Sequence, residues 1–148
     1  MKKVIFVCHG NICRSPAAEY IFKLKLIKYH LEDRFIVTSK ATSKEEIGND
    51  IYPPMKRALY NKEIPFYKHH ASQITQTDYD DADYIFYMDN NNKYWLNHLL
   101  DDYKGIIKPI TCFTPDIEYI DDPWYTGQFD QVVNQLEKCI EDIIKNIN

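Results

Sequence analysis

Residues 4–19 read V-I-F-V-C-H-G-N-I-C-R-S-P-A-A-E. The first four, Val4–Val7, are β-branched or aromatic, which is typical of a buried strand. After the polar turn that follows them, apolar residues recur at spacings of three and four from Pro16 to His30, which predicts a helix. The stretch therefore predicts a strand, a short loop and a helix in direct succession.

Three residues mark the start of this helix. Ser15 is placed to cap it, and Pro16 suits its first turn because the missing amide proton would be unpaired there anyway. Glu19 favours the positive end of the helix dipole. We therefore expect the helix to begin near Ser15.

The loop from Cys8 to Arg14 has the parts of an anion-binding site. Gly10 and Asn11 tolerate the unusual backbone angles that turn amide protons inward, and the helix terminus adds its positive dipole end. Cys8 would lie beneath this cradle, where the amides and Arg14 favour its thiolate, the nucleophilic form. The planar fork of Arg14 can hold two oxygens of a phosphoryl group, and Ser15 can donate a hydrogen bond to the sulfur. The loop therefore predicts phosphoryl transfer through a cysteine.

Other interpretations of the same residues stay open at this point. A cysteine at a strand end is often a small buried apolar residue. A zinc site using Cys8, His9 and Cys13 would lack a second ligand pair, because Cys112 and Cys139 are isolated from one another. A phosphopeptide-binding module would hold anions in this loop without turnover, but it would have no use for a nucleophile.

The rest of the chain alternates short apolar runs with longer amphipathic stretches. Further strands are expected at residues 35–39, 84–88 and 106–110, and helices at 55–61, 91–100 and 132–147. Strands separated by helices predict an α/β fold, with a parallel sheet covered by helices on both faces and a ligand site beyond the carboxyl ends of the strands. A chain of 148 residues has the usual size of one domain, so we expect a single three-layer domain over residues 1–148.

Composition and charge argue against several classes of protein. The formal net charge of -4 gives no basic surface for nucleic acid. No apolar run approaches the roughly 20 residues of a membrane span, and the run after Lys3 is too short for a signal peptide. Four cysteines at irregular spacings, without an export signal, favour free thiols in a reducing compartment. We therefore expect a cytoplasmic protein without nucleic-acid or membrane partners.

Two segments resemble the signatures of low-molecular-weight protein tyrosine phosphatases. Residues 7–19 resemble the first signature, and residues 121–125, D-D-P-W-Y, resemble the second, an Asp-Pro followed by aromatics. Shorter landmarks follow in the expected order at residues 39–43, 46–48, 73–75 and 88–89. The resemblance implies a four-stranded parallel sheet, no metal or other cofactor, and hydrolysis of phosphotyrosine-containing proteins through a phosphocysteine intermediate. We also expect inorganic phosphate or other oxyanions to bind the loop, and the protein to be a monomer or weak dimer.

The resemblance assigns the catalytic roles. Cys8 is the nucleophile, Arg14 is the phosphate clamp, and Asp122 is the general acid that protonates the leaving group and then, as a base, activates water. Trp124 and Tyr125 form an aromatic rim beside the site. Backbone amides complete the phosphate cradle, and they belong to His9, Gly10, Asn11, Ile12, Cys13 and Arg14.

Supporting roles follow from the same resemblance. Asn11, Ser15, Ser39 and His69 brace the phosphate loop, with His69 preferred to its neighbour His70. Independently of the resemblance, Cys13 lies five positions after Cys8 in the same turn, so our hypothesis is that it traps an oxidised Cys8 as a disulfide; the alternative is that Cys13 simply packs under the loop.

The sequence departs from related enzymes at informative places. Many family members carry an aliphatic residue where His9 stands. Relatives that hydrolyse phosphoarginine carry a threonine where Ile12 stands, so Ile12 favours phosphotyrosine. Arsenate reductases, the second-ranked interpretation, need a further cysteine pair in mid-chain, where this sequence has no cysteine. Metal-dependent phosphatases with an aspartate nucleophile need a second aspartate, which Asp89 and the two asparagines after it do not supply.

Overall fold

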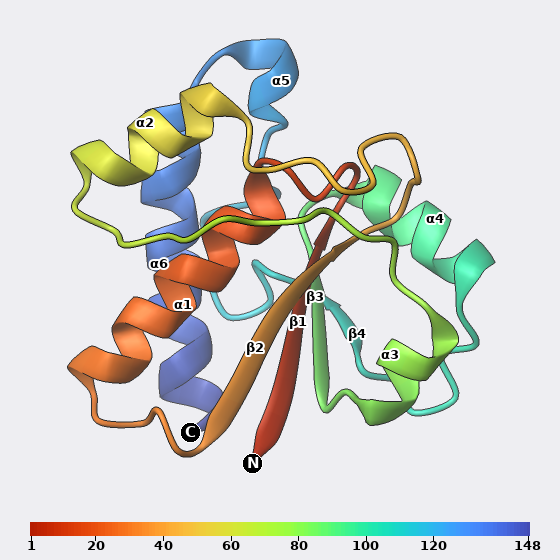
Figure 1. Ribbon diagram of the computed structural model, residues 1–148. Helices are drawn as coiled ribbons and strands as arrows, with labels where there is room; N and C mark the ends of the chain where they lie inside the picture. Colours follow the sequence, from red (N-terminus) through yellow and green to blue (C-terminus); the bar gives the residue numbers. More distant parts are fainter.

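The computed structural model describes residues 1–148 and has one sheet of four parallel strands, in the order β2-β1-β3-β4 (Figure 1). The strands are β1 (Lys2–Cys8), β2 (Phe35–Ala41), β3 (Tyr84–Tyr87) and β4 (Ile107–Pro109). The helices are α1 (Arg14–Lys28), α2 (Pro53–Asn61), α3 (Gln76–Asp81), α4 (Asn90–Leu99), α5 (Pro123–Thr126) and α6 (Phe129–Ile147). The predicted fold, a four-stranded parallel sheet with helices on both faces and a loop from Cys8 to Arg14 after the first strand, is confirmed.

The alternation of side chains along β1 divides the interior into two layers. Val4, Phe6 and Cys8 belong to the larger core, together with buried residues of α1, α2 and α6. Ile5 and Val7 belong to the smaller core, with residues of α3 and α4. Figure 1 shows these two groups of helices on opposite sides of the sheet. Because successive side chains of a strand point to opposite faces, this parity places Cys8 on the α1 side.

Strand register brings several loops to the edge of the sheet at which β1 ends. Cys8 pairs with Ala41 of β2, and Val7 pairs with Tyr87 of β3, so the three parallel strands end side by side. Backbone bonds then join the loops: Thr42 donates to the carbonyl of Cys8 at 2.9 Å, and Ile120 donates to that of Met88 at 3.0 Å. The site therefore forms from segments far apart in sequence.

α1 begins at Arg14, next to the predicted start near Ser15, but its capping differs from the sequence prediction. The N-cap residue is Cys13, whose side chain makes no capping bond, and Ser15 lies inside the helix with its side chain turned towards Cys8. No acidic residue lies in the first turn; Glu19 instead accepts hydrogen bonds from Ser39 and Lys23. The assignments of Ser15 as the cap and Glu19 as a partner of the helix dipole were therefore wrong, because tertiary contacts to the loop and to β2 take both side chains.

Two short helices, α3 and α5, have no counterpart in the prediction. The N-terminus of α3 has a capping box: the side chain of Thr75 accepts a hydrogen bond from the amide of Asp78, and the side chain of Asp78 accepts one from the amide of Thr75. The second begins at Pro123 and is capped by Asp122, which accepts from the amide of Trp124 at 3.0 Å. Segments of six and four residues are too short to show a hydrophobic period, so only their caps mark them in the sequence. None of the helices is long and apolar enough to be a candidate membrane span.

Candidate active site

A cleft of about 370 Å³ opens at the carboxyl end of β1 and is lined by three segments. The loop after β1 contributes Cys8, His9, Gly10, Ile12, Cys13 and Arg14. The loop after β2 contributes Glu45 and Glu46, and the start of α5 contributes Asp122, Trp124 and Tyr125. The structure therefore brings together the nucleophile, the arginine, the acid and the aromatic rim that the sequence suggested.

Outward hydrogen bonds shape the phosphate loop. The carbonyls of Cys8, His9 and Ile12 accept bonds from the amides of Thr42, Ser43 and Tyr52 at 2.8–3.0 Å. The carbonyl of Asn11 accepts from Nε2 of His69 at 2.6 Å, which fixes the proton on that nitrogen. With these carbonyls turned away, the loop amides are free to face inward and bind an anion.

The unusual backbone angle of the loop falls on Asn11, not on Gly10. Asn11 has φ 60°, a left-handed conformation that asparagine tolerates better than most residues, whereas Gly10 is not among the glycines with positive φ. The expectation of an unusual backbone angle at Gly10 was therefore wrong. A Cβ at position 10 would lie 3.3 Å from Cγ of Glu46, so the absence of a side chain here gives a second loop room to approach.

Asn11 is fully buried and ties the loop to its surroundings. Its side-chain amide donates to Oγ of Ser15 at 2.9 Å and to Oγ of Ser39 at 3.0 Å, and its Oδ1 accepts from the amide of Ser72 at 3.1 Å. The predicted supporting residues Asn11, Ser15, Ser39 and His69 thus form one network. The prediction missed Ser72, since a backbone donor leaves no side-chain signal.

The sulfur of Cys8 has two donors in reach. Oγ of Ser15 lies 3.0 Å from Sγ, and the amide of Ser15 donates to Sγ at 3.4 Å. Oγ of Ser15 accepts a hydrogen bond from Asn11, and its own proton can go to the sulfur or to the carbonyl of Lys40, which lies 3.4 Å away. Both groups of Ser15 are therefore positioned to donate a hydrogen bond to the sulfur.

Arg14 is 2% exposed and is held on two sides. Its Nη1 donates to Asp89 at 2.7 Å and to the carbonyl of Ile120 at 2.8 Å, while Nη2 lies 3.5 Å from Oδ2 of Asp122. Although burial opposes its charge, the negative charges of Cys8, Asp89 and Asp122 raise the pKa of Arg14. The guanidinium is therefore permanently charged and fixed before any substrate arrives. Asp89 follows β3 and thus helps to hold the guanidinium of Arg14 in place. The sequence showed Asp89 only as part of the landmark at residues 88–89.

Asp122 and the aromatic residues follow one another at the start of α5. One carboxylate oxygen of Asp122 caps the helix, and the other faces Arg14 in the cleft. Trp124 packs against Tyr52 with ring centroids 4.8 Å apart, whereas Tyr125 is 85% exposed. Asp121 does not line the cleft. The sequence missed Tyr52, which supports the rim from the segment before α2.

Glu45 and Glu46, beside the predicted His9, form a part of the cleft that the prediction did not describe. His9 Nε2 lies 3.1 Å from Oε2 of Glu45, and Asn49 donates to Oε2 of Glu46 at 2.6 Å. The landmark at residues 46–48 includes Glu46, but nothing in the sequence indicated that the loop after β2 would fold over Gly10.

The remaining cysteines differ in their surroundings. Cys13 is buried and lines the cleft, and burial, with the nearby charges of Cys8 and Asp122, raises the pKa of its thiol. Cys112 is exposed, Cys139 is buried in the core, and neither lines the cleft. No group of three or more His, Cys, Asp or Glu side chains is arranged to hold a metal ion. Cys8, His9 and Cys13, the residues considered for zinc, therefore do not form such a group.

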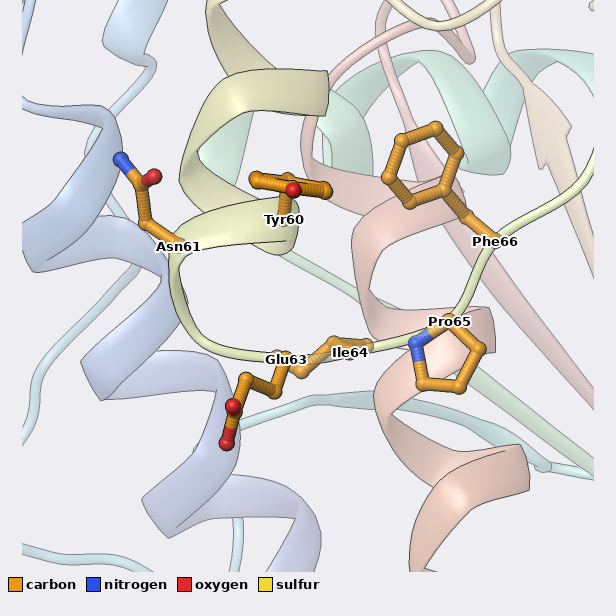
Figure 2. Close-up of a pocket in the computed structure, with 6 residues that line it drawn as sticks. All are labelled: Tyr60, Asn61, Glu63, Ile64, Pro65 and Phe66. Atoms are coloured by element: carbon orange, nitrogen blue, oxygen red, sulfur yellow. The ribbon is translucent and has the colours of Figure 1, made fainter.

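A second, shallower depression of about 690 Å³ lies beyond the end of α2 (Figure 2). Its lining consists of Tyr60, Asn61, Glu63, Ile64, Pro65 and Phe66. It contains no cysteine, histidine or arginine and therefore no nucleophile or anion clamp. The chemistry lies in the smaller cleft.

Comparison with known proteins agrees with this geometry. Residues 3–148 match the family model described as low molecular weight phosphotyrosine protein phosphatase. The chain belongs to this family. The phosphatases of this family are metal-independent, cysteine-based hydrolases that act through a phosphocysteine intermediate.

Individual relatives match over nearly their whole length. The low molecular weight phosphotyrosine protein phosphatase of Gallus gallus is 34% identical over 153 residues, covering 98% of this chain and 95% of the relative. Low molecular weight protein-tyrosine-phosphatase YfkJ of Bacillus subtilis is also 34% identical, covering 99% and 96%. The YfkJ crystal structure superposes with a TM-score of 0.94 at 33% identity, covering 99% of this chain and 94% of that one. A protein tyrosine phosphatase of Entamoeba histolytica gives 0.92 at 31% identity, covering 99% and 97%.

Proposed function

We propose that residues 1–148 form one phosphatase domain that hydrolyses phosphotyrosine in proteins. Cys8 is the nucleophile, Arg14 the phosphate clamp, and Asp122 the general acid and then the base. The observation that carries these roles is the convergence of three side chains in one cleft: Cys8 at the end of β1, Arg14 at the start of α1, and Asp122 3.5 Å from Arg14.

The first step forms the phosphocysteine. The phosphoryl oxygens lie on the amides from His9 to Arg14 and on the guanidinium of Arg14, which stabilise charge on the equatorial oxygens. Sγ of Cys8 attacks phosphorus as the bond to the tyrosine oxygen breaks. The leaving oxygen takes the proton of Asp122, so tyrosine departs neutral and Asp122 becomes a carboxylate.

The second step returns the enzyme to its starting form. The carboxylate of Asp122 takes a proton from a water molecule, whose oxygen attacks phosphorus as the bond to sulfur breaks. Inorganic phosphate leaves, and the Ser15 hydroxyl, 3.0 Å from Sγ, stabilises the released thiolate. No metal ion is needed in either step, because Arg14 and the amides neutralise the phosphoryl charge.

The cleft favours an aryl phosphate as the substrate. Cys8 is only 3% exposed, so a phosphoryl group has to enter the cleft to reach it. The flat ring of phosphotyrosine can stack beside Trp124, whose indole is held by Tyr52. We expect the enzyme to work in the cytoplasm, since a thiolate nucleophile needs a reducing compartment, and to be a monomer or weak dimer.

Hydrolysis of para-nitrophenyl phosphate at about pH 6, with a chelator present and no added metal, tests this function. We expect turnover that vanadate blocks and that a Cys112→Ser variant retains, because Cys112 lies outside the cleft. Phosphate binding without turnover would instead indicate an anion-binding module, and loss of turnover with the chelator would indicate a metal-dependent enzyme.

A further inference from the structure

The loop after β2 places two carboxylates at the phosphate loop. The side chain of Glu46 crosses Gly10, where a Cβ would lie 3.3 Å from its Cγ, and Asn49 holds its Oε2 at 2.6 Å. Glu45 is held by Nε2 of His9 at 3.1 Å. Both glutamates line the cleft and are oriented by neutral or weakly basic partners.

The charges of the cleft do not balance. Its lining includes one arginine, Arg14, against two carboxylates that the proposed mechanism leaves charged when substrate binds, those of Glu45 and Glu46. Arg14 is already paired with Asp89 at 2.7 Å and with Asp122 at 3.5 Å. No lysine or arginine lies within 4.0 Å of either glutamate carboxylate, so their charge is available to a ligand.

We infer that Glu45 and Glu46 make this cleft selective for phosphotyrosine that has lysine or arginine beside it in the substrate chain. The selectivity rests on the proposed function and specifies its substrate class. A phosphate dianion gains energy from the loop amides and Arg14, but it has to approach two carboxylates that repel it. A basic side chain next to the phosphotyrosine neutralises this repulsion, whereas an acidic one adds to it.

The size of the effect follows from the exposure of these charges. The side chain of Glu45 is 69% exposed, so each contact is screened by water and salt. Exposed ion pairs of this kind change an equilibrium constant by about 2- to 5-fold each. Two carboxylates acting on two substrates of opposite charge therefore give a difference of about 10-fold.

The experiment compares kcat/KM for two phosphotyrosine peptides that differ only at the positions flanking the phosphotyrosine, which are arginine in one and glutamate in the other. We expect the arginine peptide to be about 10-fold better at low salt, and the ratio to fall towards 1 at about 0.5 M NaCl. In the Glu45→Gln/Glu46→Gln variant the ratio should fall to about 2-fold, since glutamine keeps the shape and the hydrogen bonding but not the charge.

The matched control is Glu32→Gln/Glu63→Gln, which changes the net charge equally at two exposed positions outside the cleft. It should keep the wild-type ratio. Equal rates for both peptides in the wild type, or the same ratio in all three proteins, would overturn the selectivity while para-nitrophenyl phosphate turnover still supported the phosphatase function. Failure to hydrolyse any of the three substrates would overturn the phosphatase function itself and the selectivity with it.

Discussion

At the scale of single residues, Asn11 supports the phosphate loop with both its backbone and its side chain. Its left-handed backbone turns the chain, and its buried side chain satisfies two serines and one amide at once. One of these serines, Ser15, has its Oγ 3.0 Å from the sulfur of Cys8. Asn11 therefore connects the backbone of the loop to the side chain beside the nucleophile.

Replacing the nucleophile should separate chemistry from binding. We expect Cys8→Ser to abolish turnover, because a serine hydroxyl is not ionised in this site, and to retain phosphate binding, because the amides and Arg14 are unchanged. Steady-state kinetics and phosphate titration by calorimetry measure the two properties. Substantial activity in the variant would contradict the mechanism.

The loss of rate on removing the acid should depend on the leaving group. We expect Asp122→Ala to lower the rate on phenyl phosphate by about 10² to 10⁴, and the rate on para-nitrophenyl phosphate by less, because nitrophenolate leaves without a proton. Asp121→Ala is the matched control, since Asp121 lies outside the cleft, and its rates should stay near those of the wild type. Equal losses on both substrates in Asp122→Ala would exclude a role as the acid.

Cys13 should protect Cys8 from irreversible oxidation. Peroxide converts Cys8 to a sulfenic acid, and the thiol of Cys13 attacks this sulfur, releasing water and forming a disulfide that a thiol reductant reopens. We expect Cys13→Ser to recover less activity than the wild type after peroxide and then reductant, while Cys112→Ser recovers normally. Full recovery in Cys13→Ser would show that Cys13 only packs under the loop.

At the scale of elements, the loop between β2 and α2 supports the phosphate loop from outside. Asp50 in this loop accepts hydrogen bonds from Lys56 and from the amide of His69, the residue that holds the carbonyl of Asn11. Although desolvation opposes its ionisation, these bonds lower the pKa of Asp50 from 3.8 to about 2. The ionised Asp50 therefore fixes one of the supports of the active site.

This pKa shift gives a prediction with a definite sign. The pKa of Asp50 is lower in the folded state, so its stabilising effect is present above about pH 4 and is lost as the pH falls through about 2. We expect Asp50→Asn to lower the free energy of unfolding at pH 7 by about 1 kcal/mol, and by less at about pH 2.5. Urea unfolding of both proteins at the two pH values measures this difference. If Asp50→Asn lowers the free energy of unfolding equally at both pH values, the charge of Asp50 contributes nothing to stability.

At the scale of the whole molecule, the larger core holds α6 against α1 and thereby supports the sheet from which the site projects. Leu136 of α6 is fully buried in this core. We expect Leu136→Ala to lower the free energy of unfolding by about 2 to 4 kcal/mol, because it leaves a cavity. Leu99→Ala, at a position 38% exposed on α4, should cost less than about 1 kcal/mol. Denaturant unfolding measures both, and equal losses would contradict the packing described here.

The sequence by itself determined the order of the main elements, the parallel sheet and the identity of the central loop. These features depend on local signals: the apolar run of β1, the period of α6, and the Cys8 to Arg14 spacing directly between a strand and a helix. Backbone geometry and hydrophobic period act over neighbouring residues, so a single sequence displays them. The short helices α3 and α5 were not predicted because six and four residues span too few turns to show that period.

Only the tertiary structure decided which partners these residues meet. In the fold, Arg14 contacts Asp89 and the carbonyl of Ile120, and the side chain of Glu46 lies over Gly10. Of the two roles that the sequence suggested for Ser15, the fold selects the contact with Cys8. These contacts join residues that the parallel register of β1, β2 and β3 brings to one edge of the sheet. Register is set by packing across the whole core, so no short stretch of sequence specifies it.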